Sequence, residues 1–333
     1  MKSRLILILT FLLVVGFGYY LVRPYISPSA KVKEEVVISN DNLIKISEER
    51  VLDYWINEID RSLFYISETG VIYKLLPNSL EAEEIYDFKT RDLSLVKENS
   101  TGTRAALRVD NQWLVFGSEN YERFFLPEDI ASLDWSSDDS LVFYKKKRVG
   151  NSGGVFSFSL VTGKVSKISD FTSLDSDIFW VEDERLVFTS KPSSATTGLI
   201  QELLLDSGEV LTSVLEKNDI YSYPLFYRGG ELFYLDILLP FKTIPDKCRV
   251  LDDFIFCGVG TNGVSDIDSY LTKEIYSSDQ VVRYSLVSEE LETTPLDIDV
   301  DTNHLKISGR SLYFINRLDG LLYELFLGPI LLD

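Results

Sequence analysis

Residues 133–144 read LDWSSDDSLVFY, an apolar segment ending in Trp135, a short polar turn and a second apolar segment. Residues 154–160 (GVFSFSL) follow, and after the turn residues Thr162, Gly163 and Lys164 comes another short segment, 165–168 (VSKI). Segments of about five residues separated by Gly, Asp, Asn and Ser are typical of antiparallel hairpins. This stretch therefore predicts four consecutive strands of one small sheet.

The same unit recurs along the chain. Its most recognisable part is a short apolar run of the Leu-Val-Phe type, found at residues 63–65, 113–116, 186–188, 232–234, 254–256 and 312–314. Residues 43–333 comprise 291 residues, and seven units would have about 42 residues each, within the 40–45 typical of a four-stranded propeller blade. We therefore predict an all-β fold, a single β-propeller of seven blades, with six blades or two stacked β-sandwiches as alternatives.

The ends of the repeat region predict how the ring closes. The last unit, from residue 304 onward, has three strands and lacks a fourth, and residues 43–46 (LIKI) have the pattern of a strand without a unit of its own. Pairing the two would leave no long sheet edge exposed. We expect no amphipathic helix after residue 43.

Residues 135–143 (WSSDDSLVF) resemble the Trp-Ser-Pro-Asp-Gly…Phe signature of WD-repeat-like propellers. That type occurs in the translocation protein B of the Tol system and in relatives of prolyl oligopeptidase. Asp138 matches the signature, whereas Ser137 and Asp139 replace its Pro and Gly. Residues 248–257 (CRVLDDFIFC) are similar to a Cys-paired blade of membrane-anchored bacterial propeller proteins. The resemblance implies the fold over most of residues 43–327 and implies no particular activity.

An uncharged apolar segment lies near the N-terminus, at residues 5–22 (LILILTFLLVVGFGYYLV). As a helix it would extend roughly 27 Å, about the thickness of a bilayer core. A cleaved signal peptide is the alternative, but its apolar region is usually shorter. We predict a short cytoplasmic N-terminus (1–4), a transmembrane anchor (5–22), a tether (23–42) and an extracytoplasmic propeller domain (43–333).

Composition excludes several classes of function. The chain has 33 Lys and Arg against 52 Asp and Glu, a formal net charge of −19. Such an acidic surface repels phosphate backbones, so no nucleic-acid partner is expected. One His and two Cys are too few for Cys₄ or histidine-rich zinc sites.

The two cysteines, Cys248 and Cys257, flank a predicted hairpin turn at Asp252 and Asp253. Facing positions of an antiparallel hairpin bring Cβ atoms close enough for a disulfide, so we predict a Cys248–Cys257 bridge, with two buried free thiols as the alternative. Because disulfides persist in oxidising compartments, the bridge would agree with an exported propeller.

One acidic segment is a candidate calcium site. Asp297, Asp299 and Asp301 alternate along the chain, so in an extended strand their oxygens would face one side, as hard cations require. The Gly and Glu expected later in a calcium loop are missing, and a solvated acidic edge is the alternative reading. We predict no catalytic residues and no cofactor besides this calcium candidate, and we interpret His304, the single imidazole, as structural.

These observations favour a non-enzymatic function. We predict a membrane-anchored extracytoplasmic propeller that acts as a protein-interaction or scaffold module of the cell envelope, with a protein partner there. A propeller that binds a glycan or small ligand is one alternative. A hydrolase or lyase with carboxylates at the channel mouth is another, and two or more carboxylates with perturbed pKa values there would favour it.

Overall fold

The computed structural model describes residues 42–77, 79, 81–90, 92–136, 140–146, 153–170, 176–181, 185–190, 198–215, 219–222, 224–229, 231–261, 267–296 and 298–327. The predicted anchor, and the tether except for its last residue, lie outside these ranges. Within them, no helix has the length and apolar character needed to cross a bilayer.

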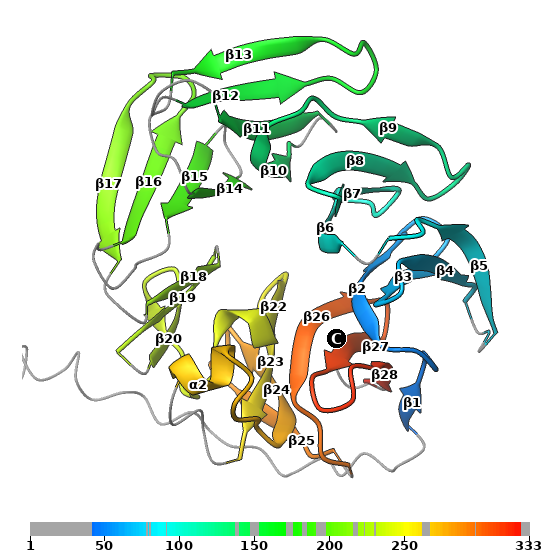
Figure 1. Ribbon diagram of the computed structural model, residues 1–333. Coiled ribbons are helices and arrows are strands. Elements are labelled where there is room, and N and C mark those ends of the chain that lie inside the picture. Colours follow the sequence, from blue (N-terminus) through cyan, green and yellow to red (C-terminus); the bar gives the residue numbers. More distant parts are fainter. Residues whose placement is uncertain are drawn as a thin grey trace, which may run out of the picture.

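The described strands form seven four-stranded antiparallel sheets arranged as a ring (Figure 1). The first sheet comprises β2 (Val51–Ile56), β3 (Leu63–Ser67), β4 (Val71–Leu75) and β5 (Ala82–Asp87), and the second β6 (Leu93–Glu98), β7 (Arg104–Val109), β8 (Gln112–Gly117) and β9 (Arg123–Phe125). The third comprises β10 (Ile130–Trp135), β11 (Leu141–Lys146), β12 (Gly153–Phe158) and β13 (Val165–Ser169), and the fourth β14 (Ser176–Val181), β15 (Arg185–Ser190), β16 (Gly198–Leu204) and β17 (Val210–Leu215).

The remaining three sheets continue the same order. The fifth comprises β18 (Ile220–Ser222), β19 (Leu225–Arg228), β20 (Glu231–Tyr234) and β21 (Ile237–Leu238), and the sixth β22 (Cys248–Leu251), β23 (Phe254–Gly260), β24 (Asp279–Ser285) and β25 (Leu291–Thr294). The seventh comprises β26 (Thr302–Ser308), β27 (Ser311–Asn316), β28 (Leu322–Phe326) and β1 (Leu43–Lys45). A single turn of 3₁₀ helix, η3 (Pro245–Lys247), precedes β22, and a five-residue helix, α2 (Ile267–Leu271), follows β23.

Each sheet runs from the centre of the ring to its rim (Figure 1). First strands of neighbouring sheets lie against one another, for example β2 against β6 and β22 against β26. The second strand β3 is buried along its whole length, whereas the fourth strand β5 is mostly exposed. A strand with both faces covered reads as a continuous apolar run rather than an alternating one, which explains why the Leu-Val-Phe runs are so visible in the sequence.

The hydrophobic core lies between the sheets. In the described part of the chain it divides into six clusters, and each joins residues of two neighbouring sheets. Between the first two sheets, Trp55 stacks on Phe64 with ring centroids 5.1 Å apart. Trp55 also forms a T-shaped contact with Phe116, with ring centroids 6.0 Å apart. Radial packing of this kind makes every sheet depend on its neighbours.

The ring is closed by the N-terminal strand. β1 pairs with β28 in an antiparallel register that sets Leu43 opposite Leu325 and Lys45 opposite Tyr323. The predicted closure by residues 43–46 is therefore confirmed. Because β1 is the edge strand of the seventh sheet, it lies at the rim of the ring and not at the channel.

The prediction of an all-β propeller is confirmed, with two local corrections. Residues 113–116 and 232–234 form third strands, β8 of the second sheet and β20 of the fifth, and not second strands as their Leu-Val-Phe pattern suggested. The short helix α2 was not expected, since its five residues are too few to show an amphipathic pattern.

Candidate functional site: the central channel

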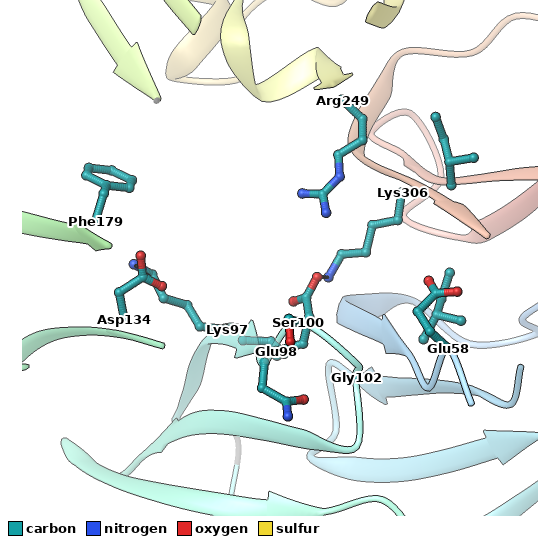
Figure 2. A pocket seen from close by; sticks show the side chains of 13 residues that line it. Glu58, Lys97, Glu98, Ser100, Gly102, Asp134, Phe179, Arg249 and Lys306 are labelled. Atoms are coloured by element: carbon teal, nitrogen blue, oxygen red, sulfur yellow. Dashed lines mark ion pairs between the residues drawn. The ribbon is translucent and has the colours of Figure 1, made fainter. Parts of the chain in front are cut away.

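A cavity of about 310 Å³ opens at the centre of the ring, where the first strands converge (Figure 2). Five of the sheets contribute charged side chains to its lining, which are Glu58, Lys97, Glu98, Asp134, Arg249 and Lys306. Phe179 of β14 supplies an aromatic wall, and Ser100 and Gly102 of the β6–β7 loop form part of its edge. Residues that lie far apart in the sequence therefore share one small polar cavity.

Lys306 links three first strands. Its Nζ lies 2.8 Å from Glu98 Oε1 on β6 and donates a hydrogen bond of 2.7 Å to the Tyr54 carbonyl on β2. The same amine lies 5.1 Å from the centroid of the Tyr54 ring. Both side chains of the ion pair are largely buried, so the amine is held in place by charge, hydrogen bond and ring together.

Lys97 plays the same part on the other side of the cavity. Its Nζ lies 3.8 Å from Asp134 Oδ1, donates to the Ile178 carbonyl at 3.1 Å and lies 5.0 Å from the Phe179 ring. Burial raises the pKa of Asp134, although the Lys97 ammonium acts in the opposite direction. Asp134 also accepts a hydrogen bond of 2.8 Å from the Trp180 amide on the neighbouring sheet, which fixes the carboxylate.

Arg249 differs from the two lysines. It belongs to β22, is exposed, and extends into the cavity beside Lys306 (Figure 2). In the part of the chain that the structure describes, its guanidinium has neither a hydrogen bond nor an ion pair. Its charge nevertheless reaches β2, where it acts to lower a Tyr54 pKa that burial and the Asp53 charge hold well above its usual value.

Next to the cavity, His304 of β26 pairs with Asp53 of β2. His304 Nδ1 lies 3.1 Å from Asp53 Oδ1, and the carboxylate also accepts hydrogen bonds from the amides of Tyr54 and Val96. The Asp53 charge raises the pKa of His304 more than burial lowers it. Burial acts to raise the pKa of Asp53, but His304 and Lys306 outweigh it, and the pKa is lowered.

These two shifts predict a pH window of stability. His304 stabilises the fold fully below its unfolded pKa of 6.5, and this is lost as the pH rises through the raised folded pKa. Asp53 stabilises the fold fully above its unfolded pKa of 3.8, and this stabilisation is lost as the pH falls through its lowered folded pKa. The difference in unfolding free energy between wild type and His304→Gln should thus be largest between pH 3.8 and pH 6.5. With 42% of the His304 side chain exposed, we expect at most about 1 kcal/mol.

Urea unfolding from pH 4 to pH 9 measures this difference directly. A difference that stayed constant between pH 5 and pH 9 would show that the His304 charge does not contribute. An exposed pair such as Lys45 and Glu48, whose Nζ–Oε2 distance is 2.7 Å, offers a control, because Lys45→Gln should leave the pH profile unchanged over this range.

A second group of charges lies between the sixth and seventh sheets and is fully buried. Lys247 Nζ lies 2.6 Å from Asp279 Oδ2 and 2.7 Å from Asp301 Oδ1, and Arg317 approaches Asp301 Oδ2 to 3.5 Å. Tyr270 donates a hydrogen bond of 2.6 Å to Asp301. Two cations and two carboxylates balance, as buried charges require. We call this set of Lys247, Asp279, Asp301 and Arg317 the buried charge cluster.

The structure places the aspartates of the predicted calcium site in different environments. Asp301 belongs to the buried charge cluster, whereas Asp299 is exposed and accepts a hydrogen bond of 2.9 Å from Ser278. Asp297 lies outside the described residues. Among the residues that are described, no group of three or more His, Cys, Asp or Glu side chains is arranged to hold a metal ion.

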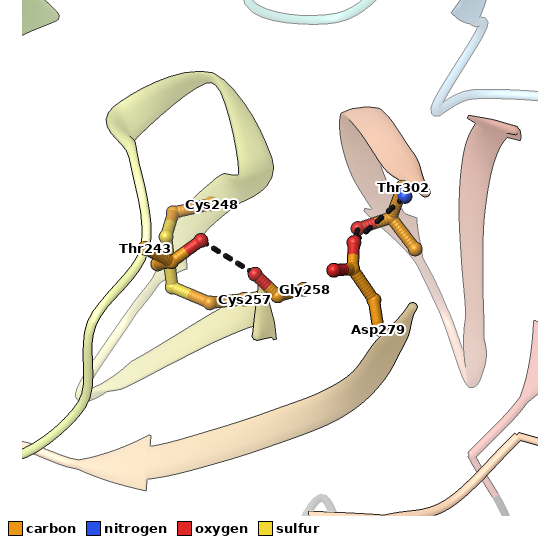
Figure 3. Close-up of a disulfide and its surroundings, with 6 residues drawn as sticks. All are labelled: Thr243, Cys248, Cys257, Gly258, Asp279 and Thr302. Atoms are coloured by element: carbon orange, nitrogen blue, oxygen red, sulfur yellow. Dashed lines mark hydrogen bonds between the residues drawn. A yellow bond between two sulfur atoms is a disulfide. The ribbon is translucent and has the colours of Figure 1, made fainter. Parts of the chain in front are cut away.

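The structure contains the Cys248–Cys257 disulfide, which joins facing positions of β22 and β23 with Cα atoms 4.1 Å apart (Figure 3). The next residue, Gly258, lies against the seventh sheet, and a Cβ there would come within 1.7 Å of Thr302 Oγ1. Thr302 in turn donates from its amide and its hydroxyl to Asp279 Oδ2, at 2.8 and 2.9 Å. The bridge and the buried charge cluster therefore fix Cys248 and Lys247, the two residues that precede Arg249.

Comparison with known proteins identifies the fold alone. No protein-family model matches the chain, and no curated protein matches its sequence. Among solved structures it is similar to U3-55K and to the WD40 repeats of RRP9, each with a TM-score of 0.55 and 10% identity, over 88% of this chain and 100% and 99% of theirs. It is also similar to a catalytically inactive variant of virginiamycin B lyase from Staphylococcus aureus, solved with quinupristin, with a TM-score of 0.53, 12% identity and coverage of 88% and 98%.

Proposed function

We propose that this chain is a binding propeller of the cell envelope that holds a partner protein over the mouth of its central channel. The observation that carries the proposal is the convergence of six charged side chains, from five different sheets, on one cavity. A propeller keeps such groups in fixed positions because each sheet is packed against two neighbours. Exposed polar groups held rigidly on a scaffold are suited to specific recognition.

The pairing of charges favours binding over turnover. Lys306 neutralises Glu98, and Lys97 lies beside Asp134. A carboxylate whose oxygens already lie against a fixed cation is less free to attack or deprotonate a substrate. The fold agrees with a binding function, because propellers commonly serve as scaffolds for interaction. The WD40 repeats of RRP9 are among the similar structures.

Two features support an exported, membrane-tethered propeller. The Cys248–Cys257 disulfide is typical of proteins in oxidising compartments, and residues 5–22 have the length and composition of a membrane anchor. Because β1 lies at the rim, a tether that enters there would leave the channel mouth open to a partner.

Site-specific photo-cross-linking tests the binding face. A cross-linking amino acid at Ser100, which is exposed at the edge of the cavity, should give a discrete adduct with one partner protein in intact cells. The matched control carries the same amino acid at Val210, which is 44% exposed on the rim strand β17. No adduct from Ser100, or the same adducts from both positions, would contradict binding at the channel mouth.

Thiol labelling tests the location. In denatured protein taken from cells, both cysteines should be blocked until reductant is added, and the intact mass should retain residues 5–22. Cysteines that label freely without reductant would place the propeller in a reducing compartment and overturn the exported location, while leaving the channel-mouth proposal to the cross-linking result.

One observation favours a second candidate, a hydrolase or lyase acting on a glycan. The cavity holds three carboxylates, and burial raises the pKa of one of them, Asp134, as a general acid requires. If this candidate is correct, glycan turnover by the purified protein should be lost in Asp134→Asn. A glycan panel that shows no turnover by the wild-type protein would remove it.

A further inference from the structure

Among the described residues, Arg249 is the cation of the cavity without a partner. Lys97 and Lys306 each meet a carboxylate and a backbone carbonyl, whereas within the described residues Arg249 forms neither an ion pair nor a hydrogen bond. The chain has 52 acidic residues against 33 basic ones, so an arginine inside a polar cavity has many carboxylates available to it. Its unpaired state leaves one full positive charge directed into the cavity.

The backbone at Arg249 is held firmly. On one side, Cys248 is joined to Cys257 by the disulfide, and next to it Lys247 is fixed by Asp279 and Asp301. On the other side, β22 continues its pairing with β23, where Arg249 faces Phe256. The rigid strand fixes the point from which the Arg249 side chain extends, so binding a ligand has to order the side chain but not the backbone.

We propose that the cavity binds one carboxylate group, held by the guanidinium of Arg249, and that an acidic side chain of the partner protein supplies it. This inference rests on the proposed function, since it names the group by which the partner is held. The planar fork of an arginine matches the two oxygens of a carboxylate and forms two parallel charge-assisted hydrogen bonds.

The surroundings favour a singly charged group over a phosphate. Glu98 and Asp134 line the same cavity, and their charges are already balanced by Lys306 and Lys97. Glu58, the third carboxylate of the lining, offsets the Arg249 charge, so the six charged side chains sum to zero. The second charge of a phosphate dianion would therefore meet three carboxylates without a further cation to offset it. The cavity volume of about 310 Å³ is at the lower end of the roughly 300–1,000 Å³ found for pockets that hold whole ligands. A cavity of this size suits one inserted side chain.

The test uses the purified full chain in detergent and three blocked tripeptides, followed by ligand-observed NMR. Acetyl-Gly-Glu-Gly-amide carries a side-chain carboxylate, acetyl-Gly-Gly-Gly carries a terminal one, and acetyl-Gly-Gln-Gly-amide carries none. We expect the glutamate peptide to bind with a millimolar Kd and the glutamine peptide to bind at least about tenfold more weakly, as the loss of charge-assisted hydrogen bonds predicts. Tighter binding of the terminal carboxylate would overturn the assignment to an acidic side chain.

Two arginine variants separate the site from the general charge of the protein. Arg249→Gln should weaken binding of the glutamate peptide at least about tenfold. Arg310→Gln removes the same charge from the exposed β26–β27 turn, where Arg310 lines a different cavity between the first and seventh sheets, and should change the Kd less than about twofold. Equal weakening by both variants, or none by Arg249→Gln, would overturn the site.

The outcome is independent of the cross-linking test. If Arg249→Gln abolishes peptide binding but Ser100 captures no partner in cells, the carboxylate site stands and the proposed function fails. If Ser100 captures the same partner in wild type and in Arg249→Gln at equal yield, the proposed function stands and the Arg249 inference is wrong.

Discussion

Replacing Lys247 by methionine is expected to lower the free energy of unfolding by about 3–5 kcal/mol, the loss typical when one partner of a buried ion pair is removed. The Lys247 side chain is completely buried between Asp279 and Asp301. Without its charge, the two carboxylates share one cation, Arg317, whose Nη1 lies 3.5 Å from Asp301. A buried carboxylate without a partner must be desolvated or protonated, and both cost free energy.

Urea unfolding at pH 7 measures this loss, with Lys242→Met as the matched control. Lys242 lies 3.3 Å from Glu231, but both side chains are exposed, so its removal should cost no more than about 1 kcal/mol. The double variant Lys247→Met with Asp279→Asn should recover part of the loss, because it removes one uncompensated charge. Equal losses in Lys247→Met and Lys242→Met would show that burial of the charge cluster does not matter for stability.

The second large effect is expected at Trp55, where substitution by alanine should destabilise the protein by about 3–5 kcal/mol. Trp55 is fully buried, stacks on Phe64 and forms a T-shaped contact with Phe116, and its Nε1 donates a hydrogen bond of 3.0 Å to Ser118 Oγ. Phe116 belongs to β8 of the second sheet and Ser118 comes directly after that strand, so the loss falls on the contact between the first and second sheets. Trp55→Phe keeps most of the packing and should cost less than half as much.

Phe125→Ala is the control for the Trp55 variants. Phe125 is an aromatic residue of the same region but is 66% exposed on the rim strand β9, so its removal should change the unfolding free energy by about 0.5 kcal/mol or less. Calorimetry or urea titration of the purified proteins would give the comparison. A Trp55→Ala protein as stable as Phe125→Ala would mean that the sheet interface adjusts to fill the cavity.

Much of the fold could be predicted from the sequence, because second strands covered on both faces read as continuous apolar runs. The second sheet shows the limit of this signal. In its second strand, Arg104–Val109, the apolar centre consists of two alanines and a leucine and has an arginine on each side. Its third strand contains the conspicuous WLVF run. Small residues suffice in β7 because the large rings of Trp55 and Phe64 fill the space beside Ala105.

The site was less predictable, since its residues become a group only when the ring closes. Lys97, Arg249 and Lys306 are each the single Lys or Arg residue of a short strand, and nothing in their local pattern distinguishes them from solvated positions. The alternation of Asp299 and Asp301 predicted a common direction. The structure instead buries Asp301 against Lys247, a residue of the 3₁₀ turn that precedes the sixth sheet, and leaves Asp299 exposed. Pairing across sheets is a tertiary property that strand periodicity does not contain.

The pairing of β1 with β28 also sets an order of events during synthesis. Among the strands that the structure describes, β1 is made first, yet its partner β28 is made last. Joining strands so distant in sequence carries a high loop-closure entropy and slows folding. Sheets that pack early therefore wait as an open arc with unpaired edges, which is the form most prone to aggregation. The synthesis of β28 thus decides when this hazard ends.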